Sequence, residues 1–130
     1  MKFESLIPNI MVNNVNETIK YYEQNLGFTL IRTVPEKGIT YDWAMMKRNE
    51  VVIMFQSLKS IDKENPVLNK IKPGGGVCLY IKVEGIHELY YDVVEKTEII
   101  SDIEKTFYDT TEFTIIDNNG YLITFSEIEK

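Results

Sequence analysis

The clearest alternation of apolar and polar positions lies between residues 8 and 28. Asn14 precedes an apolar run and Glu17 follows three residues later, which is typical of a capping box at the start of a helix. Gly27 can close the last turn in a left-handed conformation, and Phe28 can then pack back on that turn. Apolar positions recur with helical spacing at Val15, Ile19, Tyr22 and Leu26. The pattern predicts an amphipathic helix that begins at Val15 and stops before Gly27.

Apolar and β-branched runs on either side of this helix predict strands. The run FTLIRTV, which follows the helix, is bounded by a turn at Pro35 and Gly38. A short polar hinge at residues 48–50 separates two further runs. The expected strands are residues 6–12, 28–34, 40–47 and 51–57. The first half is therefore predicted to have the order β, α, β, β, β.

Residues 58–76 have a different character and separate the two halves. They contain charged residues, Pro66 and a glycine run at 74–76, so we expect a connector with room for one helical turn. A phosphate-binding loop is not expected, because no Lys-Ser or Lys-Thr pair follows the glycines.

The second half repeats the order of the first. We expect a strand at 77–83, a helix at 86–96, one strand within 99–111, and a hairpin of residues 113–117 and 121–127. Asn119-Gly120 lies inside that hairpin, where the pair is expected to supply the positive φ angles of a tight turn.

An internal repeat links the two halves. Sliding the chain on itself by 71 residues superposes Val12 on Val83 and Val15 on Ile86, and a slide of 70 superposes residues 52–55 on 122–125. The offset hardly drifts, which favours a duplicated βαβββ module over a chance match of apolar runs. We therefore predict a single α+β domain. Module 1 spans about 5–57, the connector 58–76, and module 2 about 77–128. Each module is expected to form half of a curved mixed sheet around a groove, with its helix outside.

Four stretches carry a family resemblance. They are residues 8–12 (PNIMV), 18–22 (TIKYY), 25–28 (NLGF) and 112–122, the last with Asn118 where a proline is usual. On these stretches the chain resembles the vicinal oxygen chelate superfamily, which includes glyoxalase I, extradiol dioxygenases, fosfomycin-resistance thiol transferases and the bleomycin-resistance binding proteins. The resemblance implies the paired βαβββ fold with its groove, and a homodimer.

Enzymes of this family hold a divalent metal with His, Glu or Gln side chains at four strand positions. The matching positions here are Ile7, Met54, Cys78 and Thr124. Zinc needs about three His, Cys or carboxylate ligands, and hard cations need several oxygens, so this set is a poor metal site. The adjacent residues on both sides are also non-ligands. We therefore expect no metal and no cofactor.

Strand alternation assigns a set of side chains to the groove. Trp43 is interpreted either as a ligand contact or as a core residue, and Glu112 either as a groove carboxylate for a cationic group or as a surface acid. The expected ligand-binding residues are Asn9, Met11, Trp43, Met54, Gln56, Cys78, Tyr80, Glu112 and Thr124.

Four candidate residues are interpreted as structural or solvated rather than catalytic. His87 is the only histidine and is expected on the second helix as a solvated residue, since a catalytic base needs a partner and a pocket. Cys78 is expected to be a small core or groove-wall thiol, because no neighbouring His or Arg in the sequence would activate it as a nucleophile. Glu127 and Glu129 are interpreted as solubilising acids at the C-terminal edge.

The composition of the chain limits the classes of partner that we expect it to bind. The 20 acidic and 14 basic residues give a net charge of -6, which disfavours nucleic acid. Cys78 is the only cysteine, so no intrachain disulfide is possible. No apolar run is long enough to cross a bilayer, and residues 1–5 do not resemble a signal peptide. We expect a cytoplasmic protein without a membrane partner.

Apolar walls with a few amide and hydroxyl groups suit an organic ligand. The first hypothesis is a metal-free protein of the bleomycin-resistance type that sequesters a small organic molecule, with cationic, antibiotic-like compounds among the candidates. The second is a glyoxalase- or lyase-type enzyme with an atypical site around Cys78 and Glu112. A third is a dimeric interaction module whose groove is filled by side chains.

Overall fold

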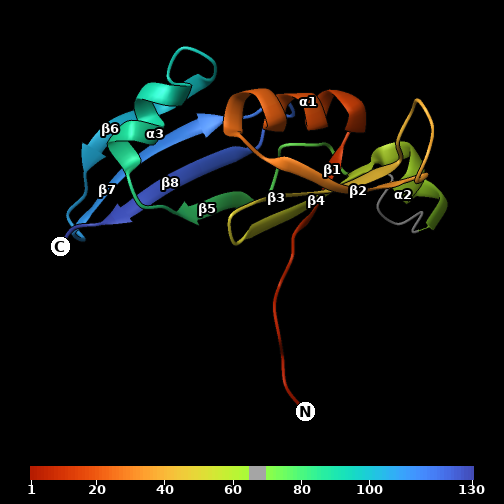
Figure 1. The fold of residues 1–130 in the computed structure, drawn as a ribbon, viewed down its shortest axis with the longest axis horizontal. Coiled ribbons are helices and arrows are strands. Elements are labelled where there is room, and N and C mark those ends of the chain that lie inside the picture. The colour runs from red at the N-terminus through yellow and green to blue at the C-terminus, as the bar shows by residue number, and fades with distance from the viewer. Residues whose placement is uncertain (65–69) are drawn as a thin grey trace. The chain divides into compact units, whose positions relative to one another are not determined.

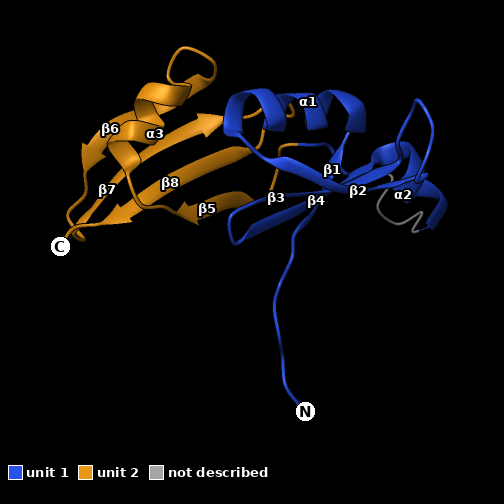
Figure 2. Cartoon of the chain, in the orientation of Figure 1, with its two compact units in different colours: residues 1–73 blue, residues 74–130 orange. Residues whose placement is uncertain are grey.

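The computed structural model describes residues 1–64 and 70–130, and their ribbon is shown in Figure 1. Residues 65–69 of the predicted connector, including Pro66, lie outside the described residues. The chain divides into two compact units, residues 1–73 and 74–130 (Figure 2). The described part of the chain contains two four-stranded mixed sheets and three helices. The predicted α+β class and the repeated βαβββ order are therefore confirmed.

Unit 1 follows the predicted order and adds one helix at its end. Its elements are β1 (Asn9–Val12), α1 (Val15–Leu26), β2 (Thr29–Val34), β3 (Trp43–Arg48), β4 (Val51–Ser57) and α2 (Leu58–Glu64). The strand order is β1-β4-β3-β2, in which β1 pairs with β4 in parallel and the other pairs are antiparallel. Helix α2 has two turns in place of the single turn expected in the connector.

Unit 2 repeats this topology. Its elements are β5 (Cys78–Lys82), α3 (Ile86–Val93), β6 (Glu98–Lys105), β7 (Thr110–Ile116) and β8 (Leu122–Ile128). The strand order β5-β8-β7-β6 again places one parallel pair at an edge. The strand expected within residues 99–111 is β6, which begins at Glu98.

Helix α1 begins and ends where the sequence predicts. The Asn14 Oδ1 accepts a hydrogen bond from the Glu17 N–H at 2.9 Å, and Gly27 closes the helix at φ 68°. The Phe28 ring packs edge-on against Tyr22 with centroids 5.5 Å apart. Tyr22 in turn lies 4.7 Å from Phe55, at the centre of the unit 1 core.

Helix α3 is capped by a side chain that lies far from it in the sequence. Gly85 has no side chain to cap the helix, and the Glu127 carboxylate instead accepts the N–H groups of Gly85 and Ile86 at 3.0 and 3.1 Å. The prediction that Glu127 only solubilises the C-terminal edge is therefore wrong. Helix α3 also ends at Val93, before the predicted residue 96, because Lys96 N–H bonds only three residues back, in a tighter turn.

Two further expectations are corrected. The first strand begins at Asn9, so residues 6–8 are not part of it and Leu6 is 86% exposed. Pro8 has no N–H to donate to a ladder, although its carbonyl accepts from Met54 N–H at 2.9 Å. In the β7–β8 connection only Gly120 has positive φ, because Asp117 Oδ1 organises a longer turn through the N–H groups of Asn119 and Tyr121.

Each unit has its own apolar core beneath its helix. Helix α1 packs on β2, β3 and β4, and α3 packs on β7 and β8. In unit 2, the Phe113 ring lies 5.2 Å from Tyr90 and 5.1 Å from Phe125. None of the helices in the described residues has the length and apolar character that a bilayer crossing requires.

Candidate functional site

Each sheet turns alternate side chains toward its helix and toward the opposite face. In unit 1, Met46 and Phe55 point toward α1 and are fully buried, whereas their neighbours Met45 and Met54 are only half-buried. In unit 2, Phe113 and Ile115 occupy the helix side, which leaves the alternate residues of β7 on the other face. The nine expected ligand-binding residues all lie on these opposite faces.

In unit 1 the structure brings together Asn9, Gln56 and Trp43, which we call the first row. Gln56 is paired with Trp43 across β3 and β4, and its Oε1 accepts from Asn9 Nδ2 at 2.9 Å. The other end of the amide donates to Ser60 Oγ at 3.0 Å and to Glu64 Oε2 at 3.2 Å. Gln56 is only 6% exposed, and these three bonds satisfy a buried amide. The amide therefore ties the first row to α2.

Unit 2 has an equivalent set, Tyr80, Ser126 and Glu112, which we call the second row. Ser126 is paired with Glu112 across β7 and β8, as Gln56 is paired with Trp43. Tyr80 is in register with Thr124 on the parallel neighbour, as Asn9 is with Met54. The Tyr80 hydroxyl oxygen lies 2.8 Å from Ser126 Oγ. The repeat thus places two cross-strand rows at matching positions, with different chemistry in each.

The second row holds a buried carboxylate among hydroxyl groups. Glu112 is 9% exposed, and its Oε2 accepts from the hydroxyls of Tyr80, Ser126 and Thr110, the last two at 2.9 Å. Its Oε1 accepts from the Tyr108 hydroxyl at 2.8 Å. Desolvation by burial raises the pKa of Glu112, but these four donors outweigh it and hold the pKa below its ordinary value. Glu112 is therefore a buried carboxylate, and its hydrogen bonds favour the ionised form.

The pKa values of Tyr80 and Tyr108 shift in the opposite direction to that of Glu112. Each phenol donates to Glu112, and this hydrogen bond raises the pKa of Tyr80 and of Tyr108 above the ordinary value. Both rings are about half exposed, at 52% for Tyr80 and 51% for Tyr108. The second row and the adjacent Tyr108 therefore present two aromatic rings to solvent beside the Glu112 carboxylate.

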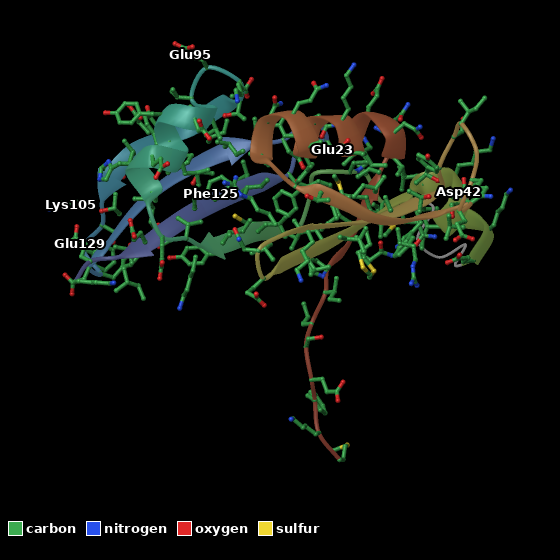
Figure 3. The ribbon with its side chains drawn as sticks, viewed as in Figure 1. Glu23, Asp42, Glu95, Lys105, Phe125 and Glu129 are labelled. Carbon is green, nitrogen blue, oxygen red and sulfur yellow. The ribbon has the colours of Figure 1, made fainter. Side chains whose placement is uncertain are left out.

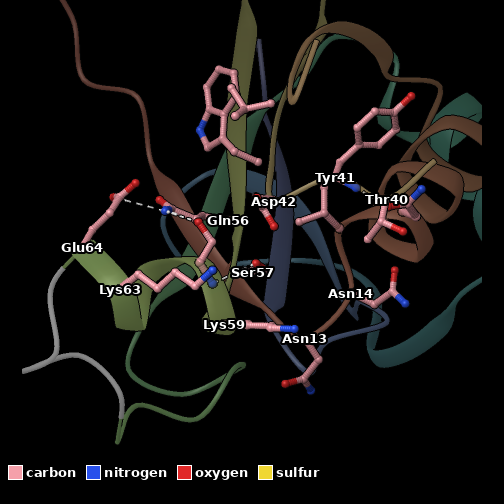
Figure 4. A pocket seen from close by; sticks show the side chains of 15 residues that line it. Asn13, Asn14, Thr40, Tyr41, Asp42, Gln56, Ser57, Lys59, Lys63 and Glu64 are labelled. Atoms are coloured by element: carbon pink, nitrogen blue, oxygen red, sulfur yellow. Dashed lines mark hydrogen bonds between the residues drawn. The ribbon is translucent and has the colours of Figure 1, made fainter. Parts of the chain in front are cut away.

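A pocket of about 950 Å³ opens at one edge of unit 1 (Figure 4). The parallel strands β1 and β4 both end at this edge, where the chain continues into α1 and α2. Its walls come from residues 13–16, residues 40–43 and the junction of β4 with α2. Trp43 and Gln56 of the first row line it, together with four charged side chains. These are Asp42, Lys59, Lys63 and Glu64. Asp42 is also labelled in the wider view of the molecule (Figure 3).

The four positions expected for a family metal do not form a ligand set. Ile7 precedes β1 and Met54 lies on β4, so unit 1 offers no metal donor at these positions. Cys78 Sγ lies 3.8 Å from Thr124 Oγ1 in unit 2, and the Thr124 hydroxyl is also within 2.8 Å of Thr114 Oγ1. A lone thiol and a hydroxyl do not supply the donors that zinc or a hard cation needs. Within residues 1–64 and 70–130, no three His, Cys, Asp or Glu side chains gather into a metal site.

Other candidates from the sequence lie outside both rows. His87 is exposed in the first turn of α3. Glu129 forms a salt bridge with Lys105 at the C-terminal edge, with its Oε1 3.6 Å from Lys105 Nζ (Figure 3). Cys78 is an exposed free thiol.

Sequence reasoning did not predict the charged walls of the pocket or most partners of Glu112. Lys59, Lys63 and Glu64 lie in the segment interpreted as a connector, and the spacing of Lys59 and Lys63 on one helical face was the available signal. Tyr108 and Thr110 lie before and at the start of β7, where no apolar alternation assigns a face.

Comparisons with known proteins identify relatives over nearly the whole chain. Residues 6–125 match the model of the Glyoxalase/Bleomycin resistance protein/Dioxygenase superfamily. Bleomycin resistance proteins from Geobacillus stearothermophilus and Staphylococcus aureus are each 29% identical over 129 residues, which covers 92% of this chain and 92% of theirs.

Solved structures show the same fold at lower identity. TioX from Micromonospora sp. ML1 has a TM-score of 0.73 at 14% identity, with 95% of each chain covered. A glyoxalase/bleomycin resistance protein/dioxygenase from Nocardioides has a TM-score of 0.78 at 12% identity, with 100% of this chain and 87% of that chain covered. The family match spans nearly all of both βαβββ units, so the chain belongs to the glyoxalase/bleomycin resistance protein/dioxygenase superfamily.

Proposed function

We propose that this protein binds a small organic ligand without a metal ion, as a sequestering protein of the bleomycin-resistance type. The observation that carries the proposal is the pair of matching rows, which place amide, indole, phenol and carboxylate groups on the faces opposite the helices. Fixed polar groups among apolar walls orient an organic molecule and give specificity. The ionised Glu112 beside two exposed phenol rings favours a ligand that carries positive charge.

The proposed ligand contacts are those that strand alternation selects. Met11 and Met54 supply apolar surface next to the first row, and Cys78 and Thr124 lie beside Tyr80 on β5 and β8. The full set is Asn9, Met11, Trp43, Met54, Gln56, Cys78, Tyr80, Glu112 and Thr124.

The test combines metal analysis with ligand binding. Protein purified without chelators and dialysed against metal-free buffer is expected to contain no stoichiometric divalent ion by elemental analysis. The same protein is then screened by thermal shift against bleomycin, other cationic glycopeptides, aromatic antibiotics and dicarbonyl-thiol adducts. A ligand at about 100 times its Kd stabilises the fold by about 2.7 kcal/mol, which raises the melting temperature by roughly 10 °C.

Point variants separate ligand contacts from general effects. Asn9→Ala and Thr124→Val are expected to weaken binding by roughly tenfold, whereas the exposed control Lys20→Gln on α1 should bind like the wild type. A retained stoichiometric metal would contradict the metal-free proposal. A melting temperature that no compound class shifts would instead support the alternative of a filled groove in an interaction module.

The enzyme alternative around Cys78 and Glu112 has less support. Both oxygens of Glu112 already accept hydrogen bonds from the protein, four in all, which leaves little capacity to take a proton from a substrate. A turnover assay with dicarbonyl-thiol adducts, run beside the binding screen, tests this alternative directly.

We also propose that the protein is a homodimer. The support is membership of a superfamily whose binding proteins are commonly dimeric, together with large apolar side chains at the surface, such as Phe3, Leu6 and Ile39. Sedimentation equilibrium at micromolar concentration is expected to give twice the mass of 15.2 kDa, and a monomer at that concentration would contradict the proposal.

A further inference from the structure

The charged side chains that line the unit 1 pocket are balanced in number. Lys59 and Lys63 lie on one face of α2, four residues apart, and Asp42 and Glu64 lie in the same cavity. Two positive and two negative side chains leave the cavity with no net charge. A ligand with a strong charge of either sign would meet as much repulsion as attraction there. The charges therefore favour a neutral ligand that needs both donors and acceptors of hydrogen bonds.

Several of these charged groups are available to a ligand. The backbone of Asp42 is fixed on both sides, because its N–H donates to Val34 carbonyl at 2.7 Å and its carbonyl accepts from Ser57 N–H at 2.8 Å. Its carboxylate projects into the pocket (Figure 4) and has no hydrogen bond or ion pair within the described residues. Lys59 and Lys63 likewise have no acidic partner in the part of the chain that the structure describes. One exposed acceptor and two exposed donors thus line the same open pocket.

The neutral part of the wall has a matching character. Asn13, Thr40 and Ser60 contribute amide and hydroxyl groups, which both donate and accept. The half-buried Trp43 contributes a flat apolar surface to the same cavity. A sugar ring has this combination of properties, because its hydroxyl groups donate and accept while its C–H face can lie against an indole ring.

We propose that this pocket binds the sugar ring of a glycosylated ligand. The inference deepens the proposed function, on which it rests for the role of Trp43 as a ligand contact. Asp42 accepts hydrogen bonds from sugar hydroxyls, Lys59 and Lys63 donate to them, and Trp43 stacks on the ring. Gln56 holds the wall in place, because its amide joins β4 to Ser60 and Glu64 of α2.

The chain supplies its own probe for this proposal. Trp43 is the only tryptophan, so fluorescence excited selectively at the indole, and not at the eight tyrosines, reports on the pocket wall. The wild type is titrated with methyl α-mannopyranoside, methyl β-glucopyranoside, methyl β-galactopyranoside and cellobiose. Inorganic phosphate and L-phenylalanine serve as anionic and zwitterionic comparisons. The expected result is a saturable change in fluorescence with at least one of the sugars, at millimolar concentration, and none with phosphate or phenylalanine.

Variants that keep Trp43 test the polar contacts. Asp42→Asn and Lys59→Gln are each expected to raise the midpoint of the sugar titration by about tenfold. The matched controls Asp92→Asn on α3 and Lys20→Gln on α1 change the same residue types at exposed positions and should leave it unchanged. Circular dichroism and melting curves of all four variants check that each is folded.

The outcomes separate this proposal from the proposed function. Saturation by phosphate or phenylalanine without a response to sugars would overturn the sugar assignment in favour of an ionic ligand. No response to any sugar overturns it as well, even if bleomycin or another antibiotic binds, in which case the proposed function stands alone. A response to sugars that Asp42→Asn weakens supports the pocket assignment even if no antibiotic binds.

Discussion

At the scale of single residues, Glu112 illustrates how far strand alternation can be trusted. Alternation with Phe113 places its side chain on the face opposite α3, and this much follows from the sequence. Its four hydroxyl partners come from β5, β7, β8 and the turn before β7. No local pattern predicts their convergence, because it depends on strand pairing over distances of up to 32 residues in the sequence.

The substitution Glu112→Gln is expected to make stability less sensitive to acid. The folded-state pKa of Glu112 is lowered, so its contribution is complete above the unfolded value of about 4.3 and is lost as pH falls through the folded value. At pH 7 the variant should be less stable by about 1–3 kcal/mol, since Gln accepts fewer of the hydroxyl bonds. Urea unfolding between pH 7 and pH 3.5 measures the difference. A gap that stays constant over this range would contradict the assigned ionised state.

At the scale of elements, the two long helices show what local sequence can and cannot specify. Helix α1 carries its cap, its apolar stripe and its glycine stop within one short stretch, so both of its ends were predictable. Helix α3 begins after Gly85, and its cap is Glu127, which lies 41 residues beyond Ile86 in the sequence. The carboxylate reaches the start of α3 only because β8 pairs with β5, the strand that precedes this helix.

We expect Glu127→Ala to loosen the start of α3. The carboxylate accepts two backbone N–H groups, and these bonds, first that from Gly85 and then that from Ile86, lower the pKa of Glu127. Its loss should lower the melting temperature and speed amide exchange at Gly85 and Ile86. Glu95→Ala, at an exposed position just after the helix, is the matched control. Equal effects of the two substitutions would show that general charge, and not the cap, is responsible.

At the scale of the whole molecule, the repeat made the topology predictable. Apolar alternation is a local property of each strand, and its recurrence at an offset of 70 to 71 residues was enough to give the same element order twice. The pocket was not predictable in the same way. Its charged wall depends on α2, a seven-residue helix whose weak apolar pattern contains a single buried residue, Ile61.

Because each unit buries its own aromatic core, matched substitutions should act on separate parts of the chain. Phe55→Ala in unit 1 and Phe125→Ala in unit 2 each remove a buried ring, at a cost of about 3–5 kcal/mol. Hydrogen exchange is expected to accelerate most in residues 9–57 for the first variant and in residues 78–128 for the second. Equal acceleration in both halves for either variant would show that the units open together.

The single tryptophan and the single cysteine of this chain allow a distance within the molecule to be measured. The only tryptophan, Trp43, begins β3 in unit 1, and the only cysteine, Cys78, begins β5 in unit 2 with an exposed thiol. A thiol-reactive acceptor dye on Cys78 therefore forms an energy-transfer pair with the native indole, without any substitution. The efficiency of transfer in the ligand-free protein then reports the distance between these two residues in solution.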